Sequence, residues 1–200
     1  MRRSPTRPCN SQAGFSMVEL AVSLCVLLIL TAIAIPTLMR SFRTYQLNDA
    51  AARLSAMLKF TRFEAVRRNT QVSFRMQTSG TGWIIGVDSN GNGTIDPAEK
   101  QEVLTGFETL LPMGAPPSPT PIITALGVAG LTTMSGNPGS VTFDARGAIR
   151  VANVVSSNVD VFYVGSASDP EFGYRAVILL PSGSTQIWTV PAGGIWQQIS

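Results

Sequence analysis

The stretch QAGFSMVELAVSLCVLLILTAIAIP, residues 12–36, decides how the chain is organised. No charged side chain occurs from Leu20 to Met39. About 20 residues of this kind, rising 1.5 Å each in a helix, match a hydrocarbon core of about 30 Å. The sequence therefore predicts a helix that can cross a membrane, with a single carboxylate, Glu19, directly before its uncharged run.

Glu19 is unexpected at the head of such a helix. A charged side chain within the bilayer costs about 2.5–3.5 kcal/mol on insertion scales and is usually kept because it has a function. One interpretation is that the carboxylate only reaches into the headgroup region. The other is that it meets a partner outside its own helix.

The charges before the apolar run indicate the topology. Arg2, Arg3 and Arg7 lie in residues 1–14, which contain no acidic residue. Such an excess of arginine is typical of the cytoplasmic side, so we expect the rest of the chain outside. A secretory signal peptide is the alternative, but its apolar region has about 7 to 15 residues and its small-residue cleavage site follows that region. Here the only small-residue boundary, Ala13–Gly14, comes first.

The sequence GFSMVEL, residues 14–20, followed by an apolar helix that contains Pro36, resembles the signal of type IV pilins and type II secretion pseudopilins. The resemblance implies that a prepilin peptidase cleaves after Gly14. Phe15 would then become the N-methylated first residue of the mature chain. The resemblance also implies that Glu19 neutralises the free amine of a neighbouring subunit during filament assembly, which would supply the partner that this carboxylate needs.

Beyond Pro36 the helical pattern becomes two-sided. Six residues recur at spacings of three and four: Leu47, Ala51, Leu54, Leu58, Thr61 and Ala65. Charged residues occupy the other faces: Arg43, Arg53, Lys59, Arg62 and Arg67. The pattern predicts that this half of the helix packs against the same chain.

From Gln71 the apolar pattern has a period of two. Seven segments read as short strands: QVSFRMQ, GWIIGVD, SVTFDARG, AIRVANV, VDVFYVG, YRAVILLP and TQIWTVP. The segment LPMGAPPSPTP reads as a proline-rich loop. We expect an α+β, pilin-like fold, in which one long N-terminal helix packs on a small antiparallel β-domain. Its parts are a cleaved leader (1–14), the transmembrane and assembly half of the helix (15–39), the amphipathic half (40–70) and the β-domain (71–200).

Four later segments, RFEAVRRN, GWIIGVDSNGNGTIDPAE, VTFDARG and LLPSGSTQIWTV, resemble the H-type minor pseudopilins and the FimT-type minor pilins. The resemblance implies a structural subunit that is anchored by one span in the cell inner membrane, with its C-terminal domain in the periplasm. Two functions follow from it: a GspH-like minor pseudopilin of a type II secretion system, or a FimT-like minor pilin of a type IV pilus. The implied partners are other filament subunits, the prepilin peptidase and methylase, and the inner-membrane assembly platform.

Nucleic-acid binding is the function that the charge pattern disfavours. Some FimT-type pilins bind DNA through arginines near the C-terminal strand, but the matching positions here, Gly183 to Gln186, are uncharged. From Gln71 onward there are five Lys and Arg against nine Asp and Glu, a net charge of −4. Phosphate binding needs clustered positive charge.

The segment DSNGNGTIDPAE, residues 88–99, fits a 12-residue calcium loop of the EF-hand type, with Gly93 at its turn. Its candidate ligands are Asp88, Asn90, Asn92, Thr94, Asp96 and Glu99. The alternative is a solvated hairpin turn, because Asn-Gly and Asp-Pro form tight turns without a metal. The strand-like segment before the loop departs from the entering helix of an EF-hand. A membrane-anchored calcium-binding module that keeps residues 1–14 is thus a further alternative.

The chain offers little for catalysis. It has no histidine, so the Ser-His-Asp and Cys-His arrangements are excluded. Cys9 would leave with the leader, and Cys25 lies inside the predicted span, so the mature chain cannot form an internal disulfide. We do not expect an enzyme, and no cofactor is required, with calcium as the one candidate ion.

Overall fold

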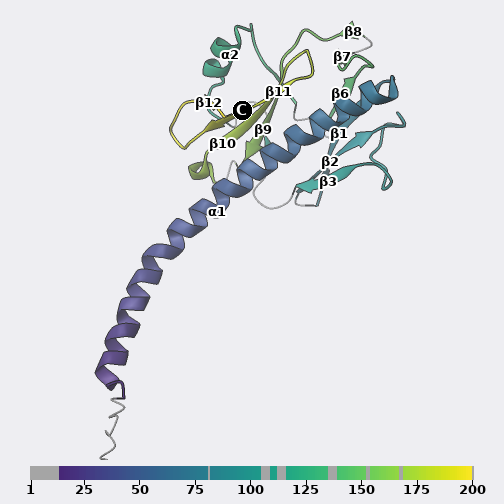
Figure 1. The fold of residues 1–200 in the computed structure, drawn as a ribbon. Coiled ribbons are helices and arrows are strands. Elements are labelled where there is room, and N and C mark those ends of the chain that lie inside the picture. Colours follow the sequence, from purple (N-terminus) through teal and green to yellow (C-terminus); the bar gives the residue numbers. More distant parts are fainter. Residues whose placement is uncertain are drawn as a thin grey trace, which may run out of the picture. The chain divides into compact units, whose positions relative to one another are not determined.

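The computed structural model describes residues 14–80, 82–104, 109–111, 116–134, 139–151, 154–166 and 169–199. The predicted leader, apart from Gly14, lies outside these residues. The chain divides into two compact units, Met1–Arg40 and Ser41–Ser200. Helix α1, Met17–Arg68, contributes to both units (Figure 1). The predicted long helix is therefore confirmed, and it begins two residues after Phe15.

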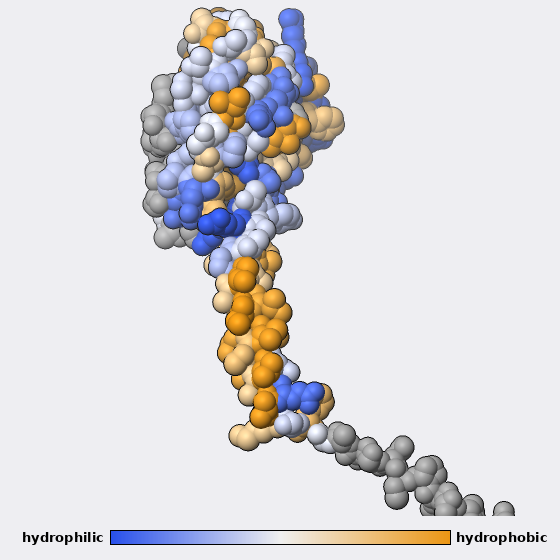
Figure 2. Space-filling model, turned by 90° about the vertical axis from the view of Figure 1, so that its left-hand side faces the viewer, coloured by the Kyte–Doolittle hydropathy of each residue, from blue (hydrophilic) through white to orange (hydrophobic). Residues whose placement is uncertain are grey.

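In the first unit, the side chains of α1 are exposed. The helix is long and apolar enough to cross a membrane by length and composition, and the apolar window that meets this criterion is 0% buried. Figure 2 shows apolar surface along this part of α1. An exposed surface of this kind is unfavourable in water, so it is suited to lipid or to other apolar helices.

The second half of α1 has a buried face. All six residues of the predicted stripe are buried, and Ala50, Ser55, Met57 and Glu64 join them. This confirms that the amphipathic half packs within its own chain. The helix ends where Asn69 adopts a left-handed conformation with φ 51°, and Thr70 donates its N–H to the carbonyl of Ala65 over 3.2 Å. Such a left-handed residue is a common helix terminator.

The strands form two six-stranded sheets. The first has the order β3-β2-β1-β6-β7-β8, and the second has the order β12-β11-β10-β9-β4, with β5 beside β9. The bounds in the first sheet are β1 Val72–Ser79, β2 Gly82–Asp88, β3 Gln101–Leu104, β6 Gly139–Phe143, β7 Ile149–Val151 and β8 Val154–Val155. The bounds in the second are β4 Thr109–Leu111, β5 Thr132–Thr133, β9 Asp160–Gly165, β10 Tyr174–Leu179, β11 Thr185–Val190 and β12 Gln197–Gln198.

One hydrophobic core joins the buried face of α1 to both sheets. Phe74 of β1 and Phe162 of β9 meet edge to face across it, with ring centroids 5.8 Å apart. A second core lies on the opposite face of the second sheet and includes Ile122 of helix α2, Thr120–Leu126. Because β9 and β10 face a core on each side, all their residues are buried.

The structure departs from the prediction in two places. Helix α2 begins within the segment that the sequence predicted to be a proline-rich loop, because Pro121 fits the first turn of a helix, where its missing N–H is not needed. Gly127 ends α2 in a left-handed conformation with φ 64°. The short β5 runs parallel to β9, so the domain is not purely antiparallel. A 3-10 turn, η1, spans Pro170–Phe172.

Candidate functional site

The predicted processing site stands at the start of α1. Gly14 and Phe15 precede the helix, are exposed and belong to no helix or strand, and an added Cβ at Gly14 would meet no atom within 4 Å. The first turn is closed by the N–H of Leu20, which donates to the carbonyl of Ser16 over 3.1 Å. Phe15 is 79% exposed. The bond between Gly14 and Phe15 is thus open to another protein.

Glu19 lies in the first turn of α1 and is exposed. A carboxylate there is favoured by the helix dipole, and the Ser16–Glu19 spacing fits a capping box. Among the described residues, however, no ion pair to the Glu19 side chain is formed, and only its backbone carbonyl is engaged, by the hydroxyl of Ser23 at 2.7 Å. The carboxylate is therefore available to a group from outside this chain.

Pro36 lies inside α1, and the helix continues through it. A proline has no N–H, so the carbonyl four residues earlier, on Ala32, loses its helical partner. The hydroxyl of Thr37 donates to the carbonyl of Ile33 over 3.4 Å. The assembly role predicted for Glu19 and Pro36 needs a neighbouring subunit and stays a prediction.

The candidate calcium loop connects β2 and β3, and its first residue is its most buried. Asp88 is 1% exposed, and Arg75 donates to it from Nε over 2.8 Å. The N–H groups of Gly91 and Gly93 donate to the same carboxylate over 2.7 and 2.9 Å. Asp88 is thus held by a cation and two backbone amides.

The other candidate ligands also bond within the loop. The amides of Asn90 and Asn92 donate to Asp96 over 2.8 and 2.9 Å. Glu99 accepts the N–H of Ser89 over 2.6 Å and that of Asp96 over 3.1 Å. In the described part of the chain, no three carboxylate or thiolate side chains gather closely enough to hold a metal ion. The oxygens have the chemistry that calcium prefers, but the loop is already closed by protein donors, so calcium there stays a prediction.

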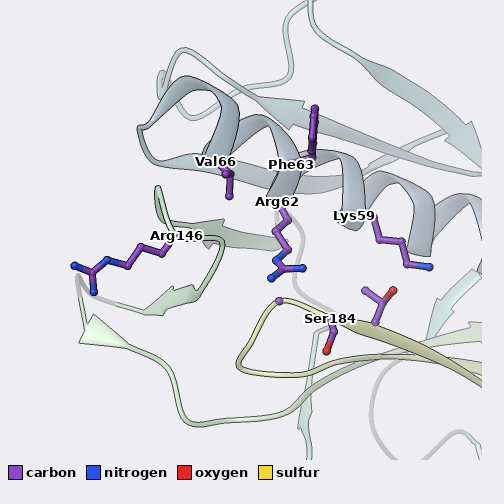
Figure 3. Close-up of a pocket in the computed structure, with 8 residues that line it drawn as sticks. Lys59, Arg62, Phe63, Val66, Arg146 and Ser184 are labelled. Carbon is purple, nitrogen blue, oxygen red and sulfur yellow. The ribbon is translucent and has the colours of Figure 1, made fainter.

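Sequence reasoning did not find a pocket of about 590 Å³ on the second unit. It lies where the last turns of α1 meet the β6–β7 and β10–β11 turns. Its lining consists of Lys59, Arg62, Phe63, Val66, Arg146, Gly183, Ser184 and Thr185. Figure 3 shows Lys59 and Arg62 pointing from α1 toward the turn that carries Ser184, whereas Arg146 extends away from Arg62.

Arg62 is clasped by two glycine turns. Its Nε donates to the carbonyl of Gly147 over 3.1 Å. A Cβ at Gly147 would lie 2.8 Å from the Nε of Arg62, and a Cβ at Gly183 would lie equally close to it. Both glycines are left-handed, with φ 77° and 78°. The turns therefore need glycine for conformation and for space.

The β6–β7 turn is organised by Asp144. Its Oδ1 accepts the N–H groups of Arg146 and Ala148 over 2.9 and 3.0 Å, and its Oδ2 accepts from Arg150 over 3.2 Å. Burial alone would raise the pKa of Asp144, but these donors lower it below its usual value. The ionised carboxylate fixes the turn and with it the backbone of Arg146 and Gly147.

The end of α1 carries an internal ion cluster. Glu64 accepts two bonds from Arg67, at 2.9 and 2.7 Å, and also pairs with Arg68. The bond from Arg67, with that from Arg68, lowers the pKa of Glu64 to about 2 although burial opposes the shift.

Three segments that line the pocket were singled out in the sequence: RFEAVRRN, VTFDARG and LLPSGSTQIWTV. Nothing in their spacing along the chain places them side by side.

Comparisons with protein families and with curated proteins both find pilin-like or type II transport proteins. A family model described as type II transport protein GspH matches residues 50–183. The pilin-like protein PilA1 of Thermus thermophilus is 34% identical over 91 residues, which are 45% of this chain. The match spans 57% of the length of that relative.

Among solved structures, the type IV minor pilin FimU of Pseudomonas aeruginosa is similar in two crystal forms. The P21 form is 18% identical, with a TM-score of 0.49 over 78% of this chain and 94% of FimU. The P65 form is also 18% identical, with a TM-score of 0.47 over 77% of this chain and 98% of FimU. Because the family model covers most of the chain, the chain belongs to the type II transport protein GspH family, within the type IV pilin and pseudopilin superfamily.

Proposed function

We propose that this chain is a minor pseudopilin of a type II secretion system, a structural subunit of the periplasmic pseudopilus that supports protein secretion. The match to the GspH family over residues 50–183 carries this proposal. The exposed apolar half of α1 supports this proposal. Apolar side chains that stay exposed in the described structure are suited to a membrane before assembly and to contact with other helices after it.

The proposal includes a defined route into the filament. The chain enters the inner membrane with residues 1–14 in the cytoplasm and the β-domain in the periplasm. A prepilin peptidase cleaves after Gly14, and Phe15 is methylated. Glu19 then forms an ion pair with the N-terminal amine of a neighbouring subunit. The open backbone at Gly14 and the unengaged carboxylate of Glu19 are what this route requires.

Deletion and complementation in the native host test the proposal. Deleting the gene is expected to leave secreted proteins in the periplasm, and the wild-type chain is expected to restore them to the medium. The matched variant Glu19→Val keeps cleavage and membrane insertion but is expected to restore secretion poorly. Normal secretion in the deletion strain would refute a role in the secretion system.

A FimT-like minor pilin of a type IV pilus is the second candidate. It is favoured by the 34% identity to the pilin-like protein PilA1. The same deletion strain separates the two functions, because loss of surface pili and twitching with normal secretion supports the pilus. Loss of secretion with normal pili supports the pseudopilus.

A further inference from the structure

The pocket beside the end of α1 gathers positive charge that no carboxylate among the described residues neutralises. Lys59, Arg62 and Arg146 line it, and none of its lining residues is acidic. Among the described residues, no carboxylate forms an ion pair with any of these three cations. The neighbouring Arg67 and Arg68 are paired with Glu64, and Arg150 is paired with Asp144.

The site is built to hold its central cation in place. The Nε of Arg62 is fixed by the carbonyl of Gly147, and its side chain lies against the two glycine turns and points from α1 toward the turn that carries Ser184. A guanidinium whose position is already fixed loses little side-chain entropy when it binds an anion. Lys59 is exposed beside it and adds a second cation.

Two of the residues that line the pocket have apolar side chains. Phe63 is 64% exposed and Val66 is 48% exposed, and both lie on the same turns of α1 as the cations. Ser184 and Thr185 add hydroxyl groups to the lining. The Oγ1 of Thr185 lies 2.9 Å from the Oγ of Ser55. An occupant that combines one or two carboxylates with an adjacent apolar side chain matches cations, hydroxyls and apolar surface together.

We propose that this pocket receives a carboxylate-bearing segment of a neighbouring filament subunit, whose Asp or Glu side chain bonds to Arg62 and Lys59 while an adjacent apolar side chain packs on Phe63. The inference rests on the proposed function, because a filament is what brings such a segment to the pocket. It assigns one contact surface between subunits to the head, apart from the helix surface of the first unit.

Charge complementarity favours a protein segment over a nucleic acid. From Ser41 onward the chain has eleven Lys and Arg and eleven Asp and Glu, so the head has no net charge to attract a polyanion. The pocket is lined by three cations, which form no ion pair with carboxylates among the described residues. Such a surface can neutralise a few carboxylates but not a run of phosphates.

The chain itself shows what the complementary surface looks like. Several of its carboxylates, among them Glu102, Asp169 and Glu171, form no ion pair in the described part of the chain. Glu171 is exposed on η1, whereas the adjacent Phe172 is partly buried against the first core. A head of the same family can therefore offer an exposed carboxylate to the pocket.

Photocrosslinking in the native host tests the contact in the full-length chain. Phe63 is replaced by p-benzoylphenylalanine, cells that assemble the filament are irradiated, and the crosslinked peptide is identified by mass spectrometry. The expected product joins position 63 to a segment of another filament subunit that contains Asp or Glu. Lys59→Glu is expected to lower the yield about tenfold, because like charges then face each other.

Charge reversal separates a contact from a folding defect. Replacing the crosslinked carboxylate of the partner by lysine is expected to restore the yield with Lys59→Glu. The control Arg53→Gln removes an exposed cation of the same helix that pairs with Asp49 outside the pocket, and it is expected to leave the yield unchanged.

Two outcomes overturn the inference while the proposed function stands. In the first, the chain supports secretion but position 63 crosslinks to nucleic acid, to lipid or to no subunit. In the second, Lys59→Glu lowers the yield no more than Arg53→Gln does. Failure of the proposed function itself is recognised separately, because the deletion strain then secretes normally.

Discussion

At the scale of single residues, Gly183 is a position where backbone and packing requirements coincide. A Cβ there would lie 2.3 Å from the carbonyl oxygen of Gly147 and 2.8 Å from Arg62, and its φ is 78°. We expect Gly183→Ala to destabilise the head by about 2–4 kcal/mol, from the strained φ and the clash together. Thermal or denaturant unfolding of the full chain in detergent measures the loss.

Gly91→Ala is the matched control for Gly183→Ala. Gly91 has a φ of 73°, but an added Cβ would meet nothing within 4 Å. Its replacement should cost only the conformational part, about 1 kcal/mol. Equal losses for the two variants would show that the clasp around Arg62 contributes nothing to stability.

Asp160 gives the head a pH dependence. It is 5% exposed in β9, and burial raises its pKa from the usual 3.8 to about 6. Between about pH 4 and pH 6, the carboxyl group of Asp160 therefore keeps its proton in the folded state but loses it in the unfolded state. Because protonation favours the folded state there, stability falls as pH rises through this window, by at most about 3 kcal/mol for this group.

Asp160→Asn is expected to remove this dependence and to stabilise the head at pH 8 relative to wild type. Denaturant unfolding between pH 4 and pH 8 measures both effects. The control Asp144→Asn should act in the opposite direction, because the pKa of Asp144 is lowered and its ionised form stabilises the β6–β7 turn. The assignment would be contradicted if the free energy of unfolding of the wild type did not fall from pH 4 to pH 6 and instead ran parallel to that of Asp160→Asn.

At the scale of elements, the sequence predicted α1 and the longer strands because their burial follows a regular period. Leu47, Leu54 and Leu58 recur at helical spacing and are all buried. Strand β1 alternates as predicted, with Phe74 and Met76 in the core. Helix α2 was missed because seven residues beginning beside prolines carry no recognisable period. The two-residue strands β5, β8 and β12 are likewise too short to show one.

The pocket could not be predicted for a different reason. Its residues come from α1, the β6–β7 turn and the β10–β11 turn, and only the tertiary fold brings them together. The net charge taken from the sequence was that of the β-domain from Gln71 onward. It therefore did not include Lys59 and Arg62, which belong to α1. The processing residues, in contrast, are contiguous in the chain and were read directly from it.

Calcium binding by the β2–β3 loop is a prediction at the scale of this element. If calcium binds the folded loop alone, a hundredfold excess over Kd stabilises the head by about 2.7 kcal/mol. Melting of the full chain in detergent should then shift upward with millimolar calcium and hardly with magnesium, which demands a tighter octahedral shell. Glu99→Gln should weaken the shift most, because the last position supplies two oxygens.

The hydrogen bonds already present set the competing outcome. Asp88 is neutralised by Arg75, and Glu99 accepts two backbone N–H groups. If melts with calcium and with chelator coincide at matched ionic strength, the loop is a turn closed by its own donors. The proposed structural role does not depend on which outcome is found.

At the scale of the whole molecule, the two units divide the work that the proposed function requires. The first presents an apolar helix surface and an unengaged carboxylate, and the second presents a folded head with an unneutralised cationic pocket. Within the described residues neither the Glu19 carboxylate nor the pocket cations have an ion-pair partner, and assembly with other subunits would supply one to each. A membrane-anchored module that acts alone would need the apolar helix but neither of these unpaired charges.

Processing at Gly14 is the step on which the whole account depends, and the mass of the N-terminal peptide tests it most directly. The chain is purified from its native host, with the host peptidase present, and its N-terminal peptide is measured by mass spectrometry for wild type and for Gly14→Val. The account predicts a wild-type chain that begins with methylated Phe15 and a Gly14→Val chain that keeps its leader. A wild-type chain that retains residues 1–14 would contradict it.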